Sequence, residues 1–216
     1  MRKVTLILAM AACAASMRAQ DSKPVRWRGP EVQSVTPAQP VPETLQKIFS
    51  NLGPADKAYS TGGFEILGPH SSAGFSQFIS LPFTPTANAH VYQVRAAIQY
   101  LSAGTPNEVN ISLYGDNAGV PGTLLAGPVT VENLSSSGCC QLAIATFRSG
   151  LAVVAGTQYW IVADTPASGT GSDFEGVWDD VPPTTKFVAE DSNGGGWYSF
   201  AANLNDPAAA VYGTVP

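Results

Sequence analysis

The 216-residue chain contains only three cysteines, three methionines and two histidines, and charged residues make up 12% of it. Its longest uncharged apolar stretch, residues 4–17, spans 14 residues. A membrane-spanning helix needs roughly 20 apolar residues, so no transmembrane segment is expected. The scarcity of histidine and cysteine also leaves few ligands for a transition metal.

Recognisable catalytic motifs are also missing. The sequence contains no G-x-S-x-G elbow, no H-E-x-x-H pair and no glycine-rich phosphate loop. His70 and His90 stand alone in polar or glycine-rich surroundings and are expected on the surface. The adjacent Asp179 and Asp180 precede two prolines and are expected in a solvated loop. We therefore expect a non-catalytic protein. Catalytic groups can also assemble from distant positions, so a hydrolase whose site has no known motif stays open, behind the two binding or structural hypotheses given below.

The cysteines of the stretch SSSGCCQLA, Cys139 and Cys140, are adjacent, and only Cys13 accompanies them. A zinc site would need two more soft ligands, and a C-x-x-C redox motif is absent. Neighbouring Cα atoms lie about 3.8 Å apart, below the usual 4.4 to 6.8 Å of a disulfide, so a vicinal bridge requires a distorted turn. A strained bridge is favoured over two separate thiols, and both alternatives stay open.

The N-terminus has the pattern of an export signal. A basic start, Met1-Arg2-Lys3, precedes the apolar run, and cleavage after Ala19 gives a signal peptide over 1–19. Alternatively, the weak lipobox that ends at Cys13 makes this residue a candidate for lipidation. Residues 20–43 are rich in proline and are expected to form a linker, which leaves 44–216 for one folded domain. The protein is expected outside the cell or at its surface.

The charge is acidic and dispersed. The chain has 11 basic and 16 acidic residues, for a net charge of −5. Removal of 1–19 takes away three basic residues, so the mature chain carries about −8. No basic cluster is present that could follow a phosphate backbone. Nucleic acid and anionic membrane surfaces are therefore not expected as partners.

The folded part shows the apolar–polar alternation of strands. In 91–101 (VYQVRAAIQYL), every second residue from Tyr92 to Tyr100 is apolar, which predicts one strand with a wet face. The run 158–164 (QYWIVAD) is apolar on both faces and is predicted to be a central strand. Further strands are expected near 44–50, 76–84, 109–113, 123–132, 140–147, 184–189 and 208–214. Many short strands separated by glycine and proline predict an all-β fold, an antiparallel, jelly-roll-like β-sandwich.

Several segments in order resemble the bacterial choice-of-anchor R domain family. They are IFSNLGP (48–54), YSTGGFEILG (59–68), LPFTPTANA (81–89), ISLYGDNAGVPGTLL (111–125), AGTQYWIVADT (155–165) and AVYGTVP (210–216). The resemblance implies a secreted β-sandwich at the cell surface or in the matrix, and no particular reaction. In many relatives a Pro-Glu-Pro sorting signal, a hydrophobic span and a basic tail follow. This chain stops at Pro216, so we expect the sorting anchor to be absent.

The segment YGDNAGVPG has the composition of a tight strand connection. Asp116 and Asn117 can bond their own backbone, and Gly119 and Gly122 permit positive φ. Their oxygens also make Asp116 and Asn117 weak candidates for a structural calcium ion. The spacing lacks the alternating ligands of a calcium loop, so no metal or other cofactor is expected.

Three aromatic residues are candidates for ligand binding. Trp178, Trp197 and Tyr198 fall in stretches rich in Gly, Asp and Pro, which are expected to form connections. Exposed rings beside polar side chains suit a sugar surface, whereas rings that cap the core would be buried. A structural or interaction role, with other envelope proteins as partners, is the main hypothesis. A carbohydrate-binding module for a surface polysaccharide is the alternative.

Overall fold

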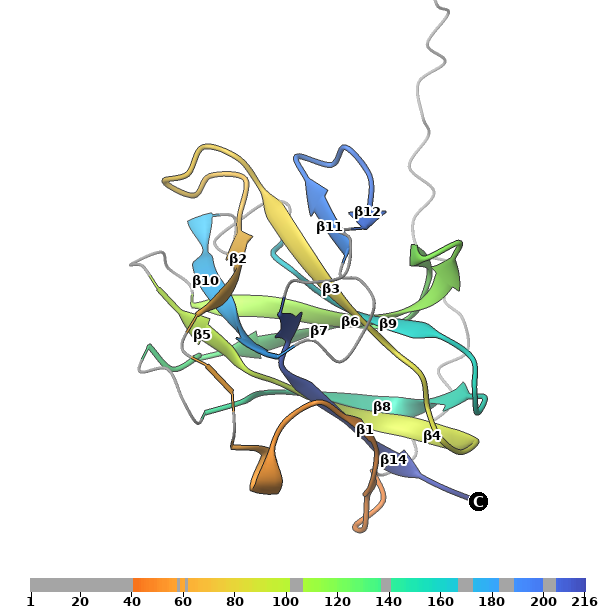
Figure 1. Ribbon diagram of the computed structural model, residues 1–216. Helices are drawn as coiled ribbons and strands as arrows, with labels where there is room; N and C mark the ends of the chain where they lie inside the picture. Colours follow the sequence, from red (N-terminus) through yellow and green to blue (C-terminus); the bar gives the residue numbers. More distant parts are fainter. Residues whose placement is uncertain are drawn as a thin grey trace, which may run out of the picture. The chain divides into compact units, whose positions relative to one another are not determined.

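Figure 1 shows a computed structural model of the chain, which describes residues 41–57, 59–60, 62–101, 107–136, 141–166, 173–182, 189–199 and 205–216. These residues belong to one compact unit. None of them forms a helix that is long and apolar enough to cross a membrane. The signal peptide, almost all of the linker, Cys13, Cys139, Cys140 and most of the predicted strand 184–189 lie outside the described residues.

The described residues are almost entirely β-structure, as predicted. In chain order the elements are β1 Gln46–Ser50, η1 Pro54–Asp56, β2 Gly63–Leu67, β3 Gln77–Phe83, β4 Ala89–Ala96, β5 Ile98–Tyr100, β6 Glu108–Asn117, β7 Val120–Glu132, β8 Ala143–Val153, β9 Tyr159–Asp164, β10 Glu175–Val181, β11 Ala189–Ser192, β12 Tyr198–Ser199, β13 Asp206–Pro207 and β14 Ala209–Thr214. Strands β2, β10, β12 and β13 correspond to no predicted strand.

The strands form two antiparallel sheets that pack as a sandwich (Figure 1). The smaller sheet has the order β1-β14-β4-β8, and the larger has the order β13-β10-β2-β3-β9-β6-β7. Strand β11 adds to β3 and to β12, and β5 adds to β10. The predicted antiparallel β-sandwich is therefore confirmed.

Strand β9 lies at the centre of the larger sheet, between β3 and β6. Trp160, Ile161, Val162 and Ala163 are all at most 1% exposed, which confirms that 158–164 is a central strand buried on both faces. The inward side chains of both sheets make one hydrophobic core. Its burial from water is the main favourable term in the stability of such a fold.

One side of the sandwich is closed because the chain crosses there between the sheets. The predicted single strand 91–101 is wrong: β4 belongs to the smaller sheet and β5 to the larger, with Ala97 between them. The chain crosses again at Ala208, between β13 and β14. Ala97 donates its N–H to the Ala208 carbonyl (2.9 Å) and accepts from the Asp179 N–H (2.8 Å), so the crossings are hydrogen-bonded to each other and to β10. Sandwich corners are commonly made by strands that change sheets.

On the other side of the sandwich the two sheets approach each other, but no strand pairing joins them within the described residues. This side is bordered by β7, the last strand of the larger sheet, and by β8, the last strand of the smaller one. Within the described residues each is hydrogen-bonded to one strand only, β7 to β6 and β8 to β4. The candidate site lies between these two edges.

Candidate functional site

Strand β8 bulges away from β4 in the middle of its length. Val91 lies opposite Leu151 and Gln93 lies opposite Thr146, so the four residues 147–150 of β8 face Tyr92 alone. Gly150 has φ = +63°, and a Cβ atom there would lie 2.8 Å from Cζ of the Tyr92 ring. The bulge therefore needs glycine at this position, both for its backbone conformation and for the space beside the ring.

Strand β7 bulges where it passes Ser112 of β6. Ile111 pairs with Val129 and Leu113 pairs with Ala126, so Gly127 and Pro128 together lie opposite the single residue between them. The Gly127–Pro128 peptide bond is cis, and Gly127 has φ = +100°. Bulges of this kind bend an edge strand and redirect its side chains, and they recur beside functional sites.

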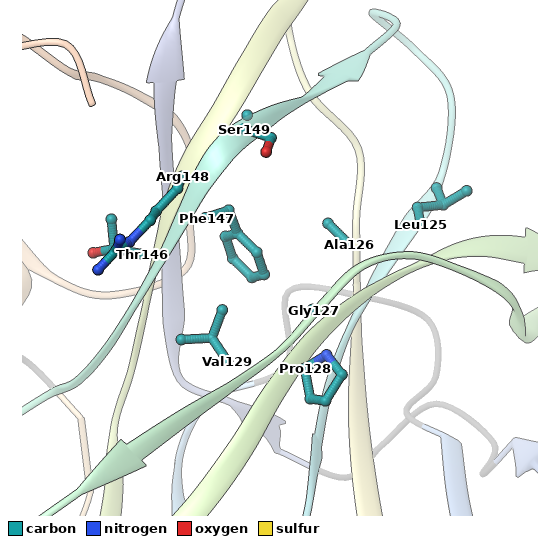
Figure 2. Close-up of a pocket in the computed structure, with 10 residues that line it drawn as sticks. Leu125, Ala126, Gly127, Pro128, Val129, Thr146, Phe147, Arg148 and Ser149 are labelled. Atoms are coloured by element: carbon teal, nitrogen blue, oxygen red, sulfur yellow. The ribbon is translucent and has the colours of Figure 1, made fainter. Parts of the chain in front are cut away.

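The two bulges enclose a cleft of about 550 Å³ between the edge strands (Figure 2). The described residues that line it all belong to β7 and β8; they are Leu125, Ala126, Gly127, Pro128, Val129, Thr146, Phe147, Arg148, Ser149 and Gly150. In Figure 2 the Phe147 ring lies between the two strands, whereas Arg148 points away from that ring. Phe147 is 5% exposed and forms an apolar floor, and Leu125 is 41% exposed.

The electrostatics of the cleft depend on one group. Arg148 is the only charged residue among the described residues that line it, and its side chain has no ion pair or hydrogen bond within this part of the chain. The ion pairs seen in this part of the chain are formed elsewhere: Lys47 of β1 and Arg95 of β4 both pair with Asp56 of η1. Arg148 therefore leaves one unneutralised positive charge at the rim.

Trp178 is not part of an exposed surface. It was expected in a connection but lies in β10, is 0% exposed and donates its indole N–H to the Ala208 carbonyl (2.9 Å). The expectation that Asp179 and Asp180 lie in a solvated loop is also wrong. Asp179 is 1% exposed, and Asp180 accepts a hydrogen bond from Ser60 Oγ (2.5 Å). These three residues hold the closed side of the sandwich and cannot contact a ligand in the cleft.

Two buried carboxyl groups have perturbed acidity. Burial raises the pKa of Asp179 to about 7, although a hydrogen bond from Gln99 Nε2 (2.7 Å) opposes the shift; the neighbouring charge of Asp180 adds to it. Burial also raises the pKa of Asp164, at the end of β9, to about 6, against a hydrogen bond from Asn110. Such shifts often mark functional sites. Neither residue lines the cleft, so they bear on stability rather than on its chemistry.

Trp197 and Tyr198 lie in and just after the turn between β11 and β12. Tyr198 is 48% exposed, and its hydroxyl donates to Glu190 Oε1 (2.8 Å); Trp197 is half-buried. Asn193 anchors the turn to the loop that precedes β3: its Oδ1 accepts a hydrogen bond from the Ser76 N–H (3.1 Å). The structure thus holds these two predicted residues together at the surface, apart from Trp178 and outside the cleft lining.

The segment YGDNAGVPG forms the β6–β7 turn, as expected of a tight strand connection. Asn117 pairs with Val120, and Ala118 and Gly119 have positive φ at the tip. Asp116 Oδ1 accepts hydrogen bonds from Trp160 Nε1 (2.8 Å) and Gln158 Nε2 (2.6 Å), which tie the turn to β9. Within the described residues no group of three or more His, Cys, Asp or Glu side chains is placed to hold a metal ion.

The two histidines and the three cysteines are the remaining candidate residues. His70 and His90 are both exposed. Cys13, Cys139 and Cys140 are outside the described residues, so the vicinal bridge and the lipidation stay predictions. The cleft residues were missed by the sequence reasoning. The signals that could have found them are the Gly-Pro dipeptide inside a predicted strand and the Arg-Ser-Gly that follows another.

Comparison with known proteins adds no relative. No family model matches the chain, and no curated protein or solved structure matches it either.

Proposed function

We propose that the protein is a non-catalytic interaction module that binds a macromolecular partner in the cleft between β7 and β8. The observation that carries the proposal is the cleft itself: two edge strands bulge at the same place and leave a volume of about 550 Å³ with an apolar floor. Binding sites are typically concave and combine apolar surface with a few polar groups, and this cleft has both.

The chemistry of the lining supports binding rather than catalysis. Among the described lining residues Arg148 has the only ionisable side chain, and an arginine stays protonated at all ordinary pH values. The hydroxyls of Thr146 and Ser149 have no histidine or carboxylate beside them in the lining that could accept their proton. The cleft therefore offers recognition groups but no acid–base pair.

We propose further that the module is exported and acts at the cell surface or in the matrix. The basic start and the short apolar run of residues 1–19 support export, and the resemblance to choice-of-anchor R domains supports the location. Mass spectrometry of the protein recovered from the medium should show an N-terminus at Gln20. A lipid-modified N-terminus at Cys13 would instead indicate a lipoprotein, and an intact Met1 would contradict cleavage of a signal peptide.

Adjacent leucines offer a matched test of the binding role. Leu124 and Leu125 are 45% and 41% exposed, and only Leu125 lines the cleft. The wild-type protein, Leu125→Gln and Leu124→Gln are screened against a phage-displayed library of random heptapeptides and against an array of matrix glycans. Binders that lose affinity with Leu125→Gln and keep it with Leu124→Gln support the proposal. If neither screen yields a binder sensitive to Leu125→Gln, the cleft is not a binding site.

A carbohydrate-binding role at the β11–β12 hairpin is the second candidate function. Its support is the exposed ring of Tyr198, whose hydroxyl is held by Glu190, beside Trp197. Trp197→Ala should abolish retention on a polysaccharide column without lowering the melting temperature. Absence of binding to every glycan on the array contradicts this role.

A further inference from the structure

We infer that the cleft takes an extended acidic peptide, which adds to the free edge of β8 and places a carboxylate against Arg148. This inference rests on the proposed function, because it names the occupant of the same cleft. It draws on three observations: the backbone of β8, the side chains that line the cleft, and the unpaired charge at its rim.

The first observation is the free edge of β8. Among the described residues this strand pairs with β4 alone, and 147–150 are displaced from the regular register with β4. An antiparallel edge strand leaves alternate N–H and C=O groups without a neighbour strand. A peptide in the extended conformation can pair with such groups, which is how many proteins bind peptides as an added strand.

The opposite edge does not compete for this role. Strand β7 contains Pro121 and Pro128, which have no N–H to donate. Both edge strands bulge, so the difference between them is the proline content, and proline removes a donor that an added strand would need. Strand β8 contains no proline over its length Ala143–Val153, so the peptide is expected on that side of the cleft.

The second observation is the alternation of side chains along β8. Phe147 lies between the strands at the cleft floor, and Arg148 points away from it (Figure 2). Successive side chains of an added strand also alternate between the two faces of its sheet. Every second residue of the peptide should therefore be apolar and pack on the exposed Leu125, above the buried Phe147, and a residue between them should lie beside Arg148.

The third observation is the charge of Arg148, which has no ion pair or hydrogen bond within the described residues. A guanidinium prefers a carboxylate, with which it forms paired, charge-assisted hydrogen bonds. The cleft favours a peptide over an acidic sugar because, among the described residues that line it, no aromatic ring is exposed for a sugar to stack on, whereas Leu125 is 41% exposed and offers apolar surface to a peptide side chain.

The test selects phage-displayed random heptapeptides on the purified full chain and sequences the bound clones. We expect an alternating pattern of apolar residues with Asp or Glu at an intervening position. The most enriched sequence is then made as a labelled peptide, and its affinity is measured by fluorescence anisotropy. Arg148→Gln should weaken binding by about 10-fold or more, and Arg148→Lys should restore part of the loss.

A double-mutant cycle gives the decisive measurement. Replacing the peptide's acidic residue by its amide should weaken binding to the wild-type protein and have little further effect on Arg148→Gln. Urea unfolding of each variant verifies that the fold is intact. Equal losses on both proteins, or selected peptides without acidic residues, overturn the acidic-peptide inference.

The two proposals fail in distinguishable ways. One outcome overturns the acidic-peptide inference but supports the proposed binding module. In this outcome the Leu125-sensitive binders are glycans, or peptides without an acidic residue. Absence of any Leu125-sensitive binder in both screens overturns both.

Discussion

Replacing Asp179 by Asn should make the protein more stable at pH 8, even though it removes a hydrogen-bonded carboxylate. The side chain is 1% exposed, and burial raises its pKa from 3.8 to about 7. An asparagine has nearly the same shape and keeps an oxygen that can accept the bond from Gln99. The substitution thus removes the cost of a buried negative charge and little else.

The magnitude follows from the pKa difference. Below about pH 4 the carboxyl is protonated in both the folded and the unfolded chain, so the two proteins should be equally stable. Between pH 4 and pH 7 the unfolded chain loses the proton and the folded chain keeps it, so wild-type stability falls as the pH rises. At about 1.4 kcal/mol per pKa unit, Asp179→Asn should gain up to about 4 kcal/mol by pH 8.

Urea unfolding monitored by tryptophan fluorescence at pH 4.5, 6, 7 and 8 measures this gain. The control is Glu65→Gln, which removes an exposed carboxylate from the neighbouring strand β2. The control should change stability by less than about 0.5 kcal/mol at each pH. A stability difference between Asp179→Asn and wild type that is the same at pH 4.5 and pH 8 would refute the reasoning, as would a net loss at pH 8.

Three further predictions concern other parts of the chain. Trp160→Phe removes the indole N–H that donates to the Asp116 carboxylate in the β6–β7 turn. The free energy of unfolding in urea should fall by about 2 to 4 kcal/mol, and a fall of less than about 0.5 kcal/mol contradicts this role. Gly150→Ala should cost about 1 to 3 kcal/mol, more than Gly156→Ala, because both have positive φ but only Gly150 would place a Cβ against a ring; equal losses contradict the clash. Non-reducing mass spectrometry should find Cys139 and Cys140 two hydrogens lighter than the reduced pair, and an unchanged mass means two separate thiols.

The fold class was predictable because it depends on local periodicity. Strand β9 was recognised from seven residues that are apolar on both faces, and β6 from the alternation around Val109, Ile111 and Leu113. Alternation identifies a strand but not the sheet to which it belongs. The break at Ala97 was therefore missed, since it is set by hydrogen bonds to residues more than 80 positions away in the chain.

Strand β10 was missed because its sequence, EGVWDDV, has the composition of a loop. Its acidic residues are accommodated by tertiary contacts, with Gln99 beside Asp179 and Ser60 beside Asp180. Such contacts have no local sequence pattern, so polar composition was read as exposure.

Little of the candidate site could be predicted from the sequence. The surface pair Trp197 and Tyr198 was identified from its glycine-rich surroundings. The cleft was not, because β7 and β8 are edge strands of different sheets, and the coincidence of their bulges depends on register with β6 and β4. Glycine and proline inside a strand indicate that a bulge exists but not what it will face.

The pairing of β1 with β14 has a mechanical consequence. Gln46 lies opposite Gly213, so the chain enters and leaves the sandwich from the same end of one strand pair. Tension that pulls these two ends apart loads the hydrogen bonds of the pair one after another, as a zipper opens, instead of all together. A module tethered by both ends would therefore release β1 under low force, whereas one held by a single end and by a partner in the cleft would bear the load through β8 and its neighbours.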